Sequence, residues 1–212
     1  MQTLRDRVIS LCEQVTGAIR NSLKAMTEQD EALARDVGAR DAQLNTLRFD
    51  IEEYAYSILS GQTLSASDVR RVVGIILVTQ ALEQIGDYAA NVAHLVIRMK
   101  RLEDTSDAAS VYALIGEMAS TAVDMTSYAC TAFLERDARA AEAIVRRDQE
   151  LVDAFDAINV TLTQPADRSG ISPERGQMLM WAAHNLHQIG MCAVNMCERA
   201  IFIATGEIKE FH

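Results

Sequence analysis

The chain has 212 residues and a formal net charge of −10. Its field repels polyanions, which excludes nucleic-acid binding that depends on neutralising backbone phosphates. Apolar residues make up 49% of the chain, enough for a sizeable core, but the longest apolar run, Val72 to Val78, is too short to cross a bilayer. Because charged residues follow Met1 closely and no signal-peptide pattern is present, we expect a cytoplasmic protein without membrane insertion.

Apolar residues recur at steps of three or four over residues 4–26, which predicts a first helix. Thr27, with Asp30 three positions on, resembles a capping box that opens a second helix, which we expect to end at Ser60-Gly61. Ser65 and Asp68 form a similar pattern at the start of a third helix. The core stripe predicted for this third helix is Ile75, Val78, Leu82, Ile85, Ala89, Val92 and Val96.

The second half of the chain follows the same plan. A charged stretch over residues 98–107 is predicted to be a linker, and helices are expected over about 108–134 and 138–163. A loop over 164–170 precedes Ser172-Pro173, where a sixth helix begins, and Thr205-Gly206 ends it. The pattern predicts an all-α protein of six helices.

An internal repeat relates the third and sixth helices. Residues 82–91 and 186–195, displaced by 104 positions, are identical at six of ten positions, among them a glycine inside each helix. A helical glycine costs roughly 0.5–1 kcal/mol relative to alanine, so its recurrence in register suggests close approach by a neighbouring helix. We therefore predict two tandem three-helix bundles, over residues 1–104 and 105–212.

Four cysteines, Cys12, Cys130, Cys192 and Cys197, show no CxxC spacing and each lies in an apolar helical pattern. We expect all four to be reduced core residues. A zinc site built on Cys192, Cys197 and His187 is a weaker alternative, because a spacing of five residues places two ligands on different helix faces.

Three segments of the chain, at residues 65–70, 82–91 and 203–207, resemble the PhoU family of bacterial phosphate-uptake regulators. The family carries a Leu-Glu-Arg-Ile-Gly-Asp-x-Ala-x-Asn-like segment in the third helix of each repeat, and residues 82–91 are similar to it, with Gln84 in place of arginine. Residues 65–70 resemble the family's Ala-Ser-Asp-Leu-Arg segment, and residues 203–207 resemble its closing Val-Thr-Gly-Glu. The resemblance covers nearly the whole chain.

The resemblance implies a cytoplasmic adaptor and not an enzyme. Family members are understood to link the ATPase subunit of a phosphate ABC importer to a sensor histidine kinase. Some members also carry multinuclear metal clusters on E/D-x-x-x-D carboxylates.

Glu83 and Asp87 stand at positions i and i+4 on the predicted third helix, where two like charges repel and a bound cation would reverse the sign. Asp41 is the third candidate ligand, and a metal bound here would be Fe, Mn, Mg or Zn. The alternative is that these are solvated carboxylates on an acidic helix that hold no metal. In the second repeat His187 and Met191 replace the two motif carboxylates, which indicates an eroded site. Glu150 and Asp153 remain as carboxylates that could still contribute a metal ligand there.

The sequence contains no nucleophile–base pair, Gly-rich phosphate loop or HExxH motif that would favour an enzyme. Two alternatives to the phosphate adaptor stay open: a helical bundle whose purpose is metal binding, and a divergent regulator of a different transporter. Assembly into a homo-oligomer is also left open.

Overall fold

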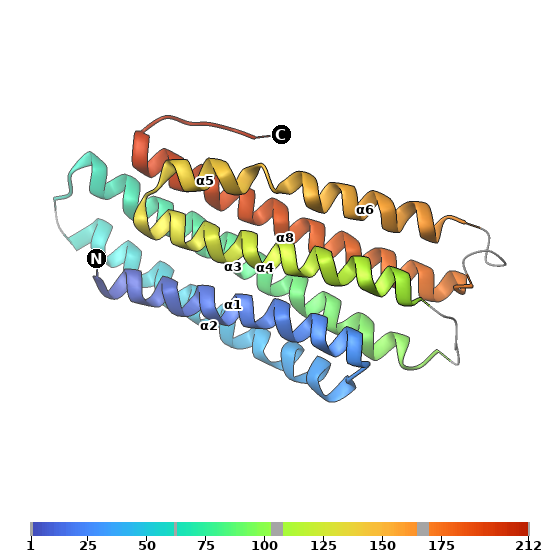
Figure 1. Ribbon diagram of the computed structural model, residues 1–212. Coiled ribbons are helices and arrows are strands. Elements are labelled where there is room, and N and C mark those ends of the chain that lie inside the picture. Colours follow the sequence, from blue (N-terminus) through green and yellow to red (C-terminus); the bar gives the residue numbers. More distant parts are fainter. Residues whose placement is uncertain (1, 62, 103–107, 165–169, 212) are drawn as a thin grey trace.

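The structure, a computed structural model, describes residues 2–61, 63–102, 108–164 and 170–211. The all-α prediction is confirmed: within these ranges no residue lies in a strand (Figure 1). None of the described helices carries an apolar stretch long enough to cross a bilayer. The helices are α1 (Gln2–Glu28), α2 (Glu31–Gly61), α3 (Ala66–Met99), α4 (Ala109–Glu135), α5 (Ala138–Val145), α6 (Asp148–Leu162) and α8 (Pro173–Thr205).

Short polar side chains start two of these helices where the sequence predicts. The Ser65 hydroxyl accepts a hydrogen bond from the backbone N–H of Asp68 at 3.1 Å, and the Ser172 hydroxyl accepts one from the N–H of Arg175 at 3.3 Å. Each bond satisfies a donor that the helix itself leaves without a partner. Gly206, with φ of 80°, ends α8 in the left-handed conformation.

The start of α2 differs from the prediction. Thr27 still belongs to α1, where its hydroxyl donates to the carbonyl of Leu23 at 3.2 Å. Asp30 caps α2 instead, because its Oδ1 accepts from the N–H of Leu33 at 3.0 Å. The prediction of a capping box at Thr27 is therefore wrong. The chain instead reverses at Gln29, a non-glycine residue with φ of 54°.

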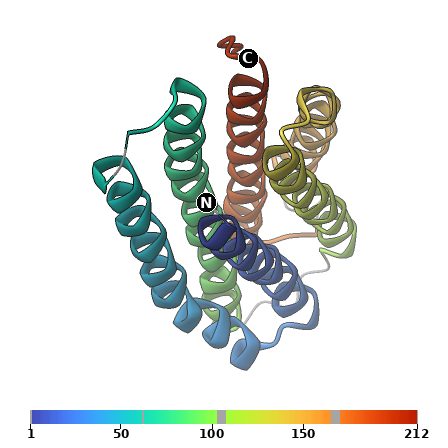
Figure 2. The same cartoon turned by 90° about the vertical axis from the view of Figure 1, so that its left-hand side faces the viewer.

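The helices form two units that lie side by side. In the first unit α1, α2 and α3 pack on one another, and in the second α4 and α8 pack on each other and on α5 and α6. Contacts between the units are made by α3 with α8 and by α1 with α4. In the turned view α2 and the α5–α6 rod lie at the two outer sides (Figure 2).

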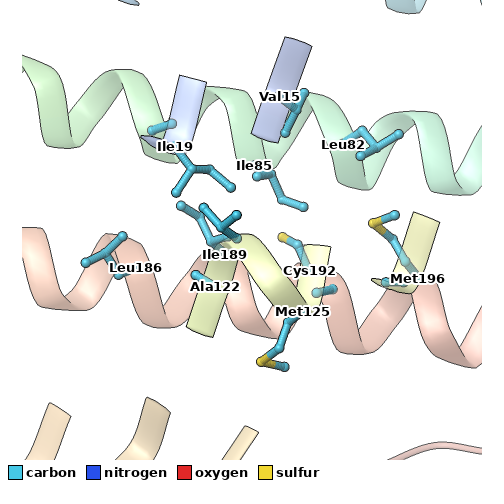
Figure 3. Packing of buried hydrophobic residues seen from close by; sticks show 14 of the residues in the cluster. Val15, Ile19, Leu82, Ile85, Ala122, Met125, Leu186, Ile189, Cys192 and Met196 are labelled. Atoms are coloured by element: carbon cyan, nitrogen blue, oxygen red, sulfur yellow. The ribbon is translucent and has the colours of Figure 1, made fainter. Parts of the chain in front are cut away.

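The third helices of the two repeats meet across this interface and run in opposite directions. Gln84 of α3 contacts Cys192 of α8 (Sγ to Oε1 3.7 Å), whereas Arg98 lies over the ring of Trp181, 5.5 Å from its centre. At mid-length Ile85 and Ile189 point toward one another between the helices (Figure 3), and both are fully buried. These equivalent residues therefore have equivalent surroundings, as the repeat predicts.

The same equivalence holds for the first helices. Each of the ten buried residues of α1 has a buried counterpart in α4, 107 positions later along the chain. The left-handed residues that follow these helices, Gln29 and Arg136, are also 107 positions apart. The two repeats share one packing plan down to the turns that end their first helices.

The helix expected over 138–163 is interrupted. It is divided into α5 and α6 at Arg146 and Arg147, where the N–H of Arg147 bonds the carbonyl of Ile144 at 2.9 Å and so tightens the turn. At the predicted linker, α3 continues to Met99, and residues 103–107 lie outside the described residues. The same is true of residues 165–169 in the predicted loop.

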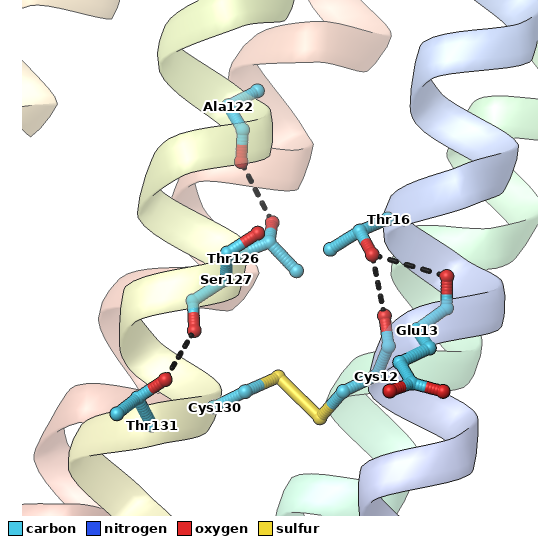
Figure 4. Close-up of a disulfide and its surroundings, with 8 residues drawn as sticks. All are labelled: Cys12, Glu13, Thr16, Ala122, Thr126, Ser127, Cys130 and Thr131. Carbon is cyan, nitrogen blue, oxygen red and sulfur yellow. Dashed lines mark hydrogen bonds between the residues drawn. A yellow bond between two sulfur atoms is a disulfide. The ribbon is translucent and has the colours of Figure 1, made fainter.

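Two of the four cysteines are paired, which corrects the expectation of four reduced thiols. Cys12 of α1 and Cys130 of α4 form a disulfide across the interface between the repeats, with Cα atoms 6.5 Å apart (Figure 4). Sequence patterns do not predict this pairing, because the two partners are 118 residues apart along the chain. Cys192 and Cys197 are free, and burial raises the pKa of the Cys192 thiol to about 11.

The helical glycines provide a test of the repeat packing. A Cβ at Gly190 would overlap the Cδ1 of the fully buried Leu151, and one at Gly86 would lie 2.6 Å from the Cδ1 of Leu44. We expect Gly190→Ala to lower the free energy of unfolding by about 1–3 kcal/mol, because the core must shift to admit the methyl group. Urea denaturation followed by circular dichroism measures this.

The matched control is Gly116→Ala in α4, where a Cβ would meet nothing within 4 Å. This variant should be stabilised by up to about 1 kcal/mol, since alanine restricts the unfolded chain. Equal effects of the two substitutions would contradict close approach at Gly190.

Candidate functional site

The first repeat gathers the three carboxylates that the sequence singles out. Asp41 on α2 and Glu83, one helical turn before Asp87 on α3, both lie close enough to the Asp87 carboxyl for their charges to raise its pKa. Glu83 and Asp87 are thus brought next to Asp41 as expected, in a cluster between α2 and α3.

A basic residue that the sequence analysis missed completes this cluster. The guanidinium of Arg48 on α2 lies 3.0 Å from Glu52 and 3.6 Å from Glu83, and all three side chains are at least 80% buried. The Nε of Arg48 and the Oδ1 of Asp41 are buried without a hydrogen-bond partner among the described residues. We refer to Asp41, Arg48, Glu52, Glu83 and Asp87 as the carboxylate–arginine cluster.

The cluster changes the acidity of Asp87. Its pKa is raised from an ordinary 3.8 to about 6, first by loss of water around the carboxyl and then by the charges of Glu83 and Asp41 and the hydrogen bond to Asp41. Arg48 opposes this shift. The Asp87 carboxyl therefore takes up a proton at a much higher pH than an isolated carboxylate does.

The second repeat builds a different structure at the equivalent place. Leu44 packs at Gly86 and Leu151 packs at Gly190, which fixes the register between α2 and α6. In this register Phe155 stands where Arg48 stands in the first repeat. His187 stands in place of Glu83, and its ring lies 5.8 Å from that of Phe155. An aromatic pair thus replaces the ion pair.

The two remaining predicted residues, Glu150 and Asp153, are exposed. Their partners are residues other than His187. Glu150 pairs with Arg147 at 3.1 Å, and Asp153 accepts a hydrogen bond from Gln149 at 2.8 Å. Arg147 also reaches Asp124 of α4 at 3.4 Å. Glu150 thus belongs to an ion-pair network with Arg147 and Asp124 at the break between α5 and α6, whereas Asp153 makes only a hydrogen bond within α6.

As arranged, these side chains do not fit the metal cluster that the resemblance implies. In the first repeat the guanidinium of Arg48 already supplies positive charge between Glu52 and Glu83. In the second repeat an imidazole, a thioether and a phenyl ring are poor ligands for hard cations. Over the described ranges, no three His, Cys, Asp or Glu side chains are grouped to hold a metal ion. Metal binding by Glu83, Asp87 and Asp41 stays a prediction.

Comparison with known proteins finds relatives that match nearly the whole chain. The profile of the PhoU domain matches residues 8–96 and again residues 115–200. The chain is 25% identical over 98% of its length to the phosphate-specific transport system accessory protein PhoU homolog 1 of Thermotoga maritima, of which it covers 89%. It is 28% identical over 90% of its length to the PhoU homolog of Zymomonas mobilis, of which it covers 78%.

Solved structures show the same fold. The crystal structure of PhoU from Pseudomonas aeruginosa superposes with a TM-score of 0.90 at 24% identity, covering 97% of both chains. PhoU from Streptococcus pneumoniae superposes with a TM-score of 0.89 at 22% identity, covering 99% of this chain and 97% of the other.

The raised pKa of Asp87 predicts a pH-dependent stability. Because the folded protein binds a proton at this carboxyl between about pH 4 and 6 while the unfolded chain does not, its contribution to stability falls as the pH rises through that window. Asp87→Asn, which cannot ionise, should therefore raise the melting temperature relative to the parent at about pH 7.5 and leave it nearly unchanged at about pH 4. Asp156→Asn, on the exposed face of α6, is the control. A pH-independent difference for Asp87→Asn would contradict the shift.

Removing the guanidinium tests its role as the resident cation. Arg48→Met leaves Glu52 and Glu83 without a counter-charge beside Asp41 and Asp87, so we expect Mn²⁺ to bind about tenfold or more tightly than to the parent. Isothermal titration calorimetry measures the affinity. Arg35→Met breaks the exposed Arg35–Glu31 pair on the same helix and should leave the affinity for Mn²⁺ unchanged. Equal affinities of the Arg48 variant and the parent would show that Arg48 does not occupy the cation position.

Proposed function

Because the chain belongs to the PhoU family, we propose that it is an accessory protein of phosphate transport that regulates phosphate uptake. The observation that carries this proposal is the match of the PhoU domain to both halves of the chain. The names of its relatives support it, since proteins similar over nearly the whole chain are phosphate-specific transport system accessory proteins.

The mechanism we propose is binding without catalysis. The chain would act in the cytoplasm as an adaptor between the ATPase subunit of a phosphate ABC importer and a sensor histidine kinase. Two helical units joined through buried interfaces of α3 with α8 and α1 with α4 provide a stiff platform. A partner bound to one repeat would therefore be held at a fixed distance and orientation from a partner bound to the other.

The negative net charge of the chain favours a partner with a basic surface. The chain carries a net charge of −10, which speeds the approach of positively charged surfaces. In the carboxylate–arginine cluster Asp87 is exposed and forms no ion pair with a described residue, whereas Glu83 pairs with Arg48. A lysine or arginine of the partner would pair with Asp87 and lower its pKa toward the ordinary value.

A second candidate is regulation of a different transporter. It is favoured by the Phe155–His187 pair, which gives the second repeat a surface chemistry unlike that of the first. A phosphate importer encoded beside this gene would favour the first function, and another transporter would favour the second. A bundle dedicated to metal binding receives less support, because Arg48 occupies the charged centre of the cluster.

Affinity purification from the native host tests the proposal. The tagged chain should recover the importer ATPase or a histidine kinase, identified by mass spectrometry, with recovery that depends on whether cells grow with high or low phosphate. Recovery of neither under both conditions, or recovery of a different transporter, would contradict regulation of phosphate uptake.

Charge reversal tests the site. Glu83→Lys combined with Asp87→Lys should reduce recovery of the partner at least several-fold, because it repels a basic surface. Circular dichroism checks that the variant stays folded without the Glu83–Arg48 ion pair. Glu117→Lys combined with Asp156→Lys changes the charge equally at exposed positions of α4 and α6 and should bind normally. Similar losses in both variants would mean that total charge and not the cluster governs binding.

A further inference from the structure

The two ends of the bundle carry different side chains at positions that are equivalent in the two repeats. At one end Gln29, the left-handed residue after α1, donates to the hydroxyl of Tyr112 at 3.1 Å and to the carbonyl of Met26 at 2.8 Å. The Tyr112 hydroxyl in turn lies 4.0 Å from the sulfur of Met99. Tyrosine, glutamine and methionine thus close this end of the interface between the repeats.

The opposite end carries the equivalent backbone with different side chains. Arg136 stands in place of Gln29, and Arg5, on the first helix, stands in place of Tyr112. An arginine thus replaces the tyrosine, and a hollow of about 90 Å³, which Phe133 helps to line, lies beside it. Figure 1 shows the N-terminal end of α1, the turn from α4 to α5 and the C-terminal end of α8 gathered at this end.

The hollow combines an apolar floor with a basic rim. Arg5 and Arg136 are exposed, and their side chains make no ion pair or hydrogen bond with the described residues; Arg71 is held loosely by Asp68 at 3.6 Å. We call this site the end pocket, formed by Gln2, Arg5, Arg71 and Arg136 around a floor of Ile75, Phe133, Leu134 and Ile203. Three arginines thus line one hollow of a chain whose net charge is −10.

The size and chemistry of the end pocket restrict its ligand. A space of about 90 Å³ is far below the roughly 300–1,000 Å³ of small-molecule sites, so it suits a single side chain inserted by a partner. The floor offers no donor to a bare anion, whereas it can bury an aliphatic group. The arginines can pair bidentately with carboxylates on either side of that group.

We propose that the end pocket binds an acidic peptide segment of a partner protein, which inserts one aliphatic side chain between Arg5 and Arg136 and places flanking carboxylates on the three arginines. Closure of the other end by Tyr112 confines binding to one end of the bundle, so a partner held here has a single orientation. The site is separate from the carboxylate–arginine cluster and does not depend on a role in phosphate uptake.

Fluorescence anisotropy with the purified chain tests the proposal. The probe is a fluorescein-labelled peptide of glutamates around one leucine, and the comparison peptide has serine in place of leucine. We expect saturable binding of the leucine peptide that weakens as NaCl is added, and binding of the serine peptide weaker by about tenfold. Equal binding of the two peptides would overturn insertion of an aliphatic side chain.

Two variants locate the site. Arg5→Glu combined with Arg136→Glu should weaken binding by about tenfold or more, and Arg5→Tyr combined with Arg136→Gln, which copies the closed end, should do the same without reversing charge. Arg20→Glu combined with Arg139→Glu, at exposed positions of α1 and α5, is the matched control and should bind as the parent does. Losses in the control equal to those in the pocket variants would overturn the assignment.

Competition separates the remaining sources of negative charge. Inorganic phosphate should displace the peptide only at concentrations where NaCl of equal ionic strength does so too. Displacement by phosphate alone would identify an anion site, and binding to phosphatidylglycerol vesicles without binding to the peptide would identify a lipid site. Either result would overturn the proposal.

Discussion

The packing of α3 against α8 is the interaction on which the rest of the structure depends. Each of these helices is the third of its repeat and contacts both its own unit and the opposite one. At their crossing Ile85 and Ile189 are fully buried, which stabilises the fold by about 1.5–3 kcal/mol for each side chain. A single repeat would expose this face to water, so each repeat needs the other. The contact of α1 with α4 and the Cys12–Cys130 disulfide strengthen the same interface.

Given this shared framework, the two repeats have diverged where the framework does not constrain them. Core positions correspond along α1 and α4, and both helical glycines receive a leucine from the neighbouring helix. Around that core, the Arg48–Glu83 ion pair of one repeat becomes the Phe155–His187 pair of the other. The side chains of both pairs lie outside the fully buried core, so they can change while the core packing is kept. The two repeats of one symmetric scaffold thereby differ in the chemistry of these side chains.

The sequence predicts the helical faces because their spacing is a property of a single helix. The stripe from Ile75 to Val96 is buried throughout, and the caps at Ser65 and Ser172 are local contacts that a few residues determine. It does not predict Arg48, because the approach of that side chain to Glu83 depends on how α2 is rotated against α3. The break at Arg147 is equally hidden, since no proline or glycine marks it. Pairing of Cys12 with Cys130 needs the contact between two repeats.

Native-state hydrogen exchange, followed by mass spectrometry with the Cys12–Cys130 disulfide reduced, measures directly whether the α3–α8 contact unites the repeats. Peptides of α3 around Ile85 and of α8 around Ile189 should exchange last and with the same opening free energy, equal to that of global unfolding. Exchange of one of these segments at a clearly lower free energy, while the other stays protected, would contradict this packing as the common basis of both repeats.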